Sequence, residues 1–250
     1  MLLWLSSAIV IIYFQEKLMF DKTKAIILKK TVLPGNGLIV KMYTQGFGVR
    51  SYFGRISKKA KNLYLPLSVV NITAYNNPKK NIQNIKEYEL DIPFRSIYQN
   101  IYKSNILLFI NEVLNQVIQE EEQNLAKFQF IENSLLRLEN DKLSMDFHLV
   151  FLMQLTQFLG FEPSMDSDKI YFDLEEGELT NIIPVHSNFL DETETNLFKS
   201  LYELAFGINN NLNFDNKLRK RTLQILVTYY KYHTDMKDLK SLQVLETIFN

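Results

Sequence analysis

The chain has 250 residues, of which 46% are hydrophobic and 22% are charged, a composition that excludes wholesale disorder. It contains no cysteine, which excludes disulfides, thiolate nucleophiles and cysteine-bound zinc. The net charge of zero hides two halves of opposite sign: 15 Lys/Arg against 5 Asp/Glu in residues 1–98, and 13 against 23 in residues 99–250. A basic half next to an acidic one predicts a surface for a polyanion.

The first 15 residues, MLLWLSSAIVIIYFQ, carry no charge. The run is shorter than the roughly 20 residues of a membrane-spanning helix, and it lacks the basic start and cleavage site of a secretory signal. Three interpretations remain: a short membrane anchor, a cryptic signal, or translated sequence ahead of a start at Met19. We favour the third, because a polar segment and a strand-like run follow Met19 directly. Residues 1–18 are then an apolar extension outside the fold.

Short apolar runs broken by turn residues extend from Lys24 to about Glu89 and predict five strands. The runs are AIILKK (25–30), GLIVKMYT (37–44), VRSYFGRI (49–56), LYLPLSVVNITAY (63–75) and NIQNIKEYEL (81–90). Five strands in about 70 residues without a helical period favour a small barrel of the OB type. We therefore predict an OB-type nucleic-acid-binding domain over residues 19–95.

After Pro93 the apolar residues follow a helical period. The predicted helices cover residues 97–119, 122–139, 145–159, 192–206, 216–233 and 241–248, with Gly160 and Gly207 ending two of them. Between them, residues 164–180 are acidic and contain a short strand, IYFDL, followed by a turn at Glu176–Gly177. The predicted fold class is α+β: a five-stranded OB-type barrel, then an all-helical domain over residues 96–250 with a short β-hairpin insertion.

The densest cationic cluster lies on the third predicted strand and the loop after it, at Arg50, Arg55, Lys58, Lys59 and Lys61. Strand alternation places Tyr52 on the same side as Arg50, where a ring between cations suits stacking of single-stranded bases. Lys79 and Lys80 extend this track. The alternative is a solvated loop with a Tyr52 that simply packs; the charge of the whole N-terminal half favours binding, without base-specific readout.

A second basic cluster lies in the acidic half, at Lys217, Arg219, Lys220 and Arg221. The local pattern favours ordinary helix-surface charge over a docking site for an acidic peptide or DNA.

Catalytic motifs are missing from the sequence, which does not predict an enzyme, a cofactor or a metal. His148, His186 and His233 lie far apart, and His148, on an apolar helix, is predicted to be a core residue. The acidic residues between Asp166 and Glu178 lack the spacing of an EF-hand and predict a solvated hairpin.

Several segments carry a resemblance to a known family. They are the first strand KAIILKK (24–30), the basic loop RISKKAK (55–61), the turn LGFEP (159–163), and a tail with Tyr230-x-x-His233 followed by Lys240-Ser241-x-x-Val244-Leu245. Their order resembles the bacterial recombination mediator RecO over about residues 22–249. Many members hold zinc with four cysteines after the LGFEP-type turn. This chain resembles the cysteine-free Bacteroidetes-type branch, in which Ile170 and Phe172 are expected to hold the hairpin against the helices.

The resemblance implies a cytoplasmic, nucleoid-associated DNA repair factor without enzymatic activity. Such proteins bind single- and double-stranded DNA, anneal complementary strands, and act with RecR to load RecA onto DNA coated by single-strand-binding protein. By position, the barrel cations would contact phosphates, and the residues from Lys217 to Arg221 would receive the acidic tail of single-strand-binding protein. No membrane partner is expected.

Two alternatives come from other functional classes. The first is a membrane-tethered adaptor that uses the N-terminal apolar run as an anchor and the acidic helices as a partner surface. The second is a nuclease with magnesium on the acidic loop, which predicts metal-dependent strand cleavage.

Overall fold

The computed structural model describes residues 20–55, 65–75, 77, 79–119, 122–165, 168–209 and 214–248. These residues form two compact units. The first contains the described residues up to Arg95 together with Ile118–Asn133, and the second contains Ser96–Val117 together with the described residues from Ser134 onward. The predicted N-terminal extension, residues 1–18, lies outside the described residues.

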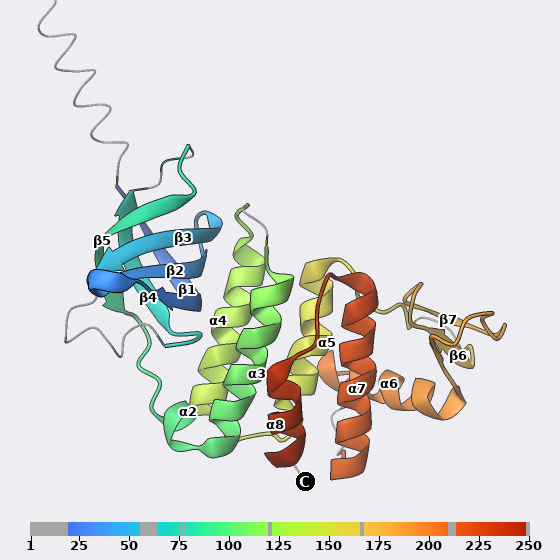
Figure 1. Cartoon of the computed structure of the whole chain (residues 1–250). Coiled ribbons are helices and arrows are strands. Elements are labelled where there is room, and N and C mark those ends of the chain that lie inside the picture. The colour runs from blue at the N-terminus through green and yellow to red at the C-terminus, as the bar shows by residue number, and fades with distance from the viewer. Residues whose placement is uncertain are drawn as a thin grey trace, which may run out of the picture. The chain divides into compact units, whose positions relative to one another are not determined.

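The first unit is a closed barrel of five strands (Figure 1). They are β1 (Asp21–Val32), β2 (Gly37–Thr44), β3 (Gly48–Arg55), β4 (Val69–Tyr75) and β5 (Ile82–Leu90). Around the barrel their order is β1-β2-β3-β5-β4, with β4 pairing again with β1 and with β3 parallel to β5. This arrangement of five strands confirms the predicted OB-type barrel.

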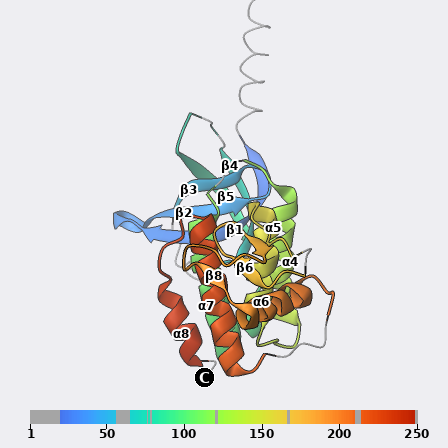
Figure 2. The ribbon, with the colours of Figure 1, turned by 90° about the vertical axis from the view of Figure 1, so that its right-hand side faces the viewer.

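Side chains that alternate along the strands fill the barrel interior, which contains Ala25, Ile27, Leu38, Val40, Met42, Tyr52, Val70, Ile72 and Ala74. A register shift between Ile27 and Lys29 changes which side of β1 faces inward. The short 3-10 helix η1 (Pro34–Asn36) joins β1 to β2, and Gly35 adopts a positive φ of 72° there. In Figure 2 the tip of this hairpin, drawn in blue, projects from the barrel.

The segment Ile118–Asn133 packs on the outside of the barrel. The ring of Phe128 lies 5.8 Å from that of Tyr43, and the Tyr43 hydroxyl donates to the carbonyl of Asn124 at 3.2 Å. Lys24 bonds Glu132 at 2.7 Å. The sequence pattern predicted a helix in this segment but did not predict that it groups with the barrel.

The second unit is helical. Its helices are α2 (Ser96–Gln99), α3 (Ile101–Val117), α5 (Phe147–Leu159), α6 (Glu192–Ala205), α7 (Asn216–His233) and α8 (Lys240–Ile248), and α4 (Leu125–Asn140) contributes its residues from Ser134 onward. One long helix was predicted over residues 97–119, and this prediction is wrong at one point. The Asn100 side chain accepts from the backbone N–H groups of Tyr102 and Lys103, so it caps α3 and separates it from α2.

Helix α5 forms the centre of this unit and packs against α3, α6 and α7. It is buried on several sides, which is why its sequence is apolar almost all round. Gly160 ends it in the left-handed conformation with φ 83°, as predicted.

A three-stranded sheet in the order β7-β6-β8 interrupts the helices; Figure 2 shows β6 and β8 near α6. Its strands are β6 (Tyr171–Asp173), β7 (Glu178–Thr180) and β8 (Phe189–Leu190). The expected hairpin is confirmed, but only one of its two expected anchors is buried. Phe172 contacts the rings of Phe198 and Tyr229, whereas Ile170 is 44% exposed because it precedes β6.

Candidate nucleic-acid interface

Two lysines lie side by side on the outside of the barrel. The strand register pairs Lys29 of β1 with Lys41 of β2, and Lys41 in turn with Ser51 of β3. Two residues earlier on β2, Ile39 pairs with Thr31 of β1 and with Phe53 of β3. Paired residues point to the same side of an antiparallel sheet, with Cβ atoms about 5 Å apart. We call these six outward residues the lysine face.

The two lysines repel each other. Burial lowers the pKa of Lys41, and the positive charge of Lys29 lowers it further. Like charges directly opposite each other on neighbouring strands destabilise a sheet. A phosphate between the two ammonium groups would offset this repulsion, so the lysine face is suited to an anionic ligand.

Phe53 supplies an aromatic surface on the same face. Its side chain is half-buried, and a Cβ atom added at Gly37 would lie 3.3 Å from a carbon of its ring. The ring therefore lies over a position without a side chain on β2. Phe53 thus shares the outward face with Lys29 and Lys41. Single-strand binders combine an aromatic ring with cations, with bases on the ring and phosphates at the lysines.

The prediction that Tyr52 offers an exposed ring is wrong. Tyr52 does lie on the same side of β3 as Arg50, but that side faces the barrel interior, and Tyr52 is completely buried. Burial raises the pKa of its hydroxyl. Arg50 is half-buried, and its Nη1 donates to the carbonyl of Val49 at 3.3 Å. The predicted alternation of side chains along β3 is right, but the side assigned to the barrel interior is wrong. This error exchanges every inward residue of the strand for an outward one.

Lys79 and Lys80 are exposed in the turn between β4 and β5, as expected for a basic track. The buried side chain of Gln83 organises this turn by donating to the carbonyls of Asn77 and Lys80. Because β5 begins with Ile82 opposite Ser51, the turn leads directly to the lysine-bearing side of the barrel wall. In OB folds, this loop and the faces of the second and third strands are the common nucleic-acid contacts.

Of the remaining barrel cations in the sequence prediction, Lys58, Lys59 and Lys61 lie outside the described residues. Arg55 ends β3 opposite Gly37. Their contact with phosphates stays a prediction.

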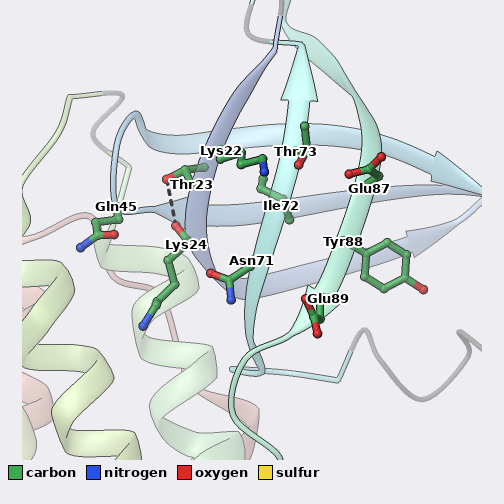
Figure 3. Close-up of a pocket in the computed structure, with 10 residues that line it drawn as sticks. All are labelled: Lys22, Thr23, Lys24, Gln45, Asn71, Ile72, Thr73, Glu87, Tyr88 and Glu89. Carbon is green, nitrogen blue, oxygen red and sulfur yellow. Dashed lines mark hydrogen bonds between the residues drawn. The ribbon is translucent and has the colours of Figure 1, made fainter.

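A depression of about 630 Å³ lies on another part of the barrel, over β1, β4 and β5 (Figure 3). Lys22 and Lys24 line it, but so do Glu87 and Glu89. Lys24 is held at 2.7 Å by Glu132 and at 3.0 Å by Asp91, and the bond with Glu132 raises its pKa more than burial lowers it. These carboxylates cancel the positive charge, so the depression is not suited to a polyanion.

The basic cluster of α7 is largely paired within the protein. Arg219 is buried and donates to Asp146 at 2.7 Å and to the carbonyl of Phe214, so the prediction of an accessible cation is wrong for this residue. Lys220 lies 3.3 Å from Glu246, and Arg221 Nε donates to Glu194 at 2.7 Å.

Lys217, by contrast, is exposed at the start of the same helix. Both Lys220 and Arg221 also remain exposed to solvent at their ion pairs. Exposed pairs of this kind contribute little to stability and exchange readily. Contact with a partner through these three residues therefore stays a prediction.

Two of the segments that carry the family resemblance, the LGFEP turn and the tail motif, meet the small hairpin in one largely buried cluster. The Tyr229 hydroxyl donates to the carbonyl of Phe161, and His233 Nε2 donates to the carbonyl of Leu174 at 2.9 Å. The ring of Phe161 stacks on His233. Gly177 has a φ of 73°, and a Cβ there would lie 2.8 Å from the Tyr229 oxygen. The LGFEP turn, the hairpin and the tail motif thus position one another, and these residues are structural.

Among the described residues, no group of three or more histidine or acidic side chains could hold a metal ion. None of the helices in the described part of the chain is long and apolar enough to cross a membrane.

His148 is buried, as predicted, and burial lowers its pKa to about 3, with a smaller effect from Arg219. A pKa so far below 7 makes the imidazole a weak proton acceptor, and its burial keeps a substrate away, so His148 does not suit general base catalysis.

Comparison with known proteins decides the family. Family models for the N-terminal and C-terminal regions of recombination protein O match residues 19–94 and 98–243. The chain belongs to the RecO family. The DNA repair protein RecO of Flavobacterium psychrophilum is 38% identical over 238 residues, covering 92% of this chain and 99% of the relative. That of Bacteroides fragilis is 34% identical, covering 93% and 100%. RecO of Porphyromonas gingivalis is 25% identical, covering 91% and 98%.

Membership in the RecO family gives this chain a role in DNA repair and recombination. The predicted relationship to Bacteroidetes-type members is confirmed. The residues of the lysine face, however, were not among the sequence predictions. The alternating apolar residues Leu38, Val40 and Met42 could have revealed it, because they place Lys41 on the outside of β2.

Proposed function

We propose that this RecO family protein binds single- and double-stranded DNA through the lysine face and anneals complementary strands. The observation that carries the proposal is the direct pairing of Lys29 with Lys41 on the outward face that also carries Phe53. Phosphates would lie at the two lysines, and an unpaired base would stack on Phe53. Lys79 and Lys80, together with Lys58, Lys59 and Lys61, would extend the contact along the strand.

The mechanism of annealing is electrostatic. Two DNA strands repel each other through their phosphates, and a cationic surface that holds one strand lowers the cost of bringing the second one close. No chemical bond is made or broken, so we propose a binding protein rather than an enzyme. Contacts with phosphates and with the face of a base carry no sequence code, and binding is therefore independent of sequence.

Helix α7 supports a second contact, with the acidic tail of single-strand-binding protein. The carboxylates of such a tail can replace Glu246 at Lys220 and Glu194 at Arg221, because both cations are exposed to solvent and paired on the surface. Lys217 would add a third cation. Arg219 would position the helix through its buried pair with Asp146 and would not touch the tail. With RecR, the protein would help load RecA onto the uncovered strand.

The test is annealing of complementary oligonucleotides coated with the cognate single-strand-binding protein, with and without its C-terminal tail. We expect annealing that depends on the tail and falls steeply with salt. Reversing the charges of Lys58, Lys59 and Lys61 tests the basic loop separately: unchanged annealing would remove this loop from the site. If the wild-type protein does not bind single-stranded DNA in a salt-dependent manner, the proposed function is wrong.

A further inference from the structure

Three large aliphatic side chains are exposed within four residues of the small sheet's connecting loop. This loop, residues 181–188, joins β7 to β8. Ile182 is 78% exposed, Ile183 is 58% exposed, and Val185 is fully exposed at 106%. Single exposed aliphatic residues are common on protein surfaces, but contiguous ones mark sites of interaction.

The end of the loop is fixed by polar contacts. His186 Nε2 lies 3.2 Å from a carboxylate oxygen of Asp173, and the backbone N–H of Asn188 donates to His186 Nδ1 at 3.2 Å. The side chain of Asn188 donates to Glu175 at 2.5 Å. The carboxylate of Asp173 is held in turn by the backbone N–H groups of Glu175 and Glu176. These contacts fix the end of the loop directly after Val185, and a fixed backbone there lowers the entropic cost of binding a partner.

The surroundings of the loop are acidic. Residues 162–198 contain ten Asp and Glu residues against a single lysine and no arginine. Those exposed in the structure include Asp168, Glu175, Glu176, Glu178, Asp191 and Glu192. A surface of this charge repels nucleic acid and anionic lipid, and it attracts a basic protein surface.

We propose that the 181–188 loop docks into a protein partner that carries an apolar pocket rimmed by lysine and arginine. Ile182, Ile183 and Val185 would enter the pocket, and the surrounding carboxylates would face its basic rim. An apolar centre surrounded by a polar, charged rim is the usual anatomy of a protein interface. This surface lies in the helical unit and shares no residue with the lysine face. Its failure would leave the proposed DNA binding untouched.

The experiment places a photo-reactive amino acid, p-benzoylphenylalanine, at position 185 of the full chain and irradiates cells of the source organism. The matched control carries the same amino acid at position 208, where Ile208 is 67% exposed. Helix α6, about 20 Å long, lies between the two positions along the chain. Mass spectrometry identifies the adduct and the cross-linked peptide, and the purified partner is then titrated against wild type, Val185→Asp and Ile208→Asp.

We expect an adduct specific to position 185, on a protein segment rich in lysine and arginine. Val185→Asp should weaken binding of the purified partner at least about tenfold, as for a hot-spot residue, with Ile208→Asp unchanged. Circular dichroism and DNA annealing should be the same for all three proteins. The proposal is wrong if no adduct is specific to position 185, or if the adduct joins a second copy of this chain, nucleic acid or lipid. Equal affinity of Val185→Asp and wild type would also overturn it.

Discussion

Removing the two charges of the lysine face should weaken DNA binding without weakening the fold. The change is Lys29→Gln with Lys41→Gln, because glutamine keeps most of the side-chain length and removes the charge. The two lysines are direct cross-strand neighbours, and burial together with the charge of Lys29 lowers the pKa of Lys41. Removing this repulsion should leave the melting temperature unchanged or raise it.

The loss of affinity follows from counterion release. Each phosphate contact on single-stranded DNA contributes about 0.7 to the slope of log K against log salt, so two lost contacts reduce the slope by about 1.4. The same relation gives a loss of about 14-fold at 0.15 M monovalent salt and about 70-fold at 0.05 M. The ratio between wild type and variant should thus widen as salt is removed.

Fluorescence anisotropy with a labelled oligonucleotide, read over a salt series, measures both affinity and slope. The matched control is Lys142→Gln with Lys237→Gln, which removes the same net charge from two exposed lysines of the helical unit. This control should keep the wild-type slope. A Lys29/Lys41 variant with wild-type affinity and slope would refute the assignment of phosphates to this face.

Four further changes separate binding from stability. Phe53→Ala should weaken single-stranded DNA binding by about 5- to 150-fold, equivalent to about 1–3 kcal/mol of stacking, whereas Tyr52→Ala should lower the free energy of unfolding by about 3–5 kcal/mol because it empties the barrel core. Glu112→Gln should cost about 1.5 kcal/mol at pH 7, because the Glu112 carboxylate accepts from both the backbone N–H and the hydroxyl of Ser241 at the start of α8. Burial raises the pKa of Glu112, but these bonds outweigh burial and hold it below its ordinary value of 4.5. The carboxylate therefore stabilises the fold fully above pH 4.5, and the deficit of the variant should vanish as the pH falls through the folded-state pKa. Arg219→Met should cost about 3–5 kcal/mol, since it leaves a buried carboxylate without its partner.

Urea unfolding measures the stability changes, at pH 7 and at pH 3.5 for the Glu112 variant. A Phe53→Ala protein that binds as wild type would remove the stacking contact, and a Tyr52→Ala protein of full stability would contradict its place in the core. An equal deficit of Glu112→Gln at both pH values would mean that the carboxylate charge does not stabilise α8. Full stability of Arg219→Met would leave its buried ion pair without an energetic role.

The barrel could be predicted from the sequence because its turns and apolar alternation are regular. The facing of β3 could not. Residues 49–54 read Val-Arg-Ser-Tyr-Phe-Gly, so an aromatic residue stands on each side of the strand and neither phase is excluded. Only pairing with β2 decides it, because Tyr52 lies opposite Val40 of the core and Phe53 opposite Ile39 of the outer wall. The pairing of Lys29 with Lys41 likewise depends on the register between β1 and β2, which the sequence does not show.

For the helices, too, the sequence predicts local structure better than contacts between distant residues. Their positions and the glycines that end them could be predicted from the helical period, but their contacts could not. Arg219 looks like a surface cation in the sequence, and its burial depends on Asp146, which is 73 residues away. The aliphatic residues of the 181–188 loop gave no periodic signal, since their exposure is a property of the small sheet that carries them.

Cross-linking identifies directly which residues of the protein single-stranded DNA contacts. An oligonucleotide carrying 5-iodouracil cross-links on irradiation to an aromatic side chain stacked on the modified base, and mass spectrometry identifies the residue. If a base stacks on Phe53, the adduct lies on Phe53 of β3, is lost in Phe53→Ala, and is reduced when Lys29 and Lys41 are both changed to glutamine. Adducts confined to the helical unit, with none in the peptides of β1 to β3, would contradict DNA binding through the lysine face.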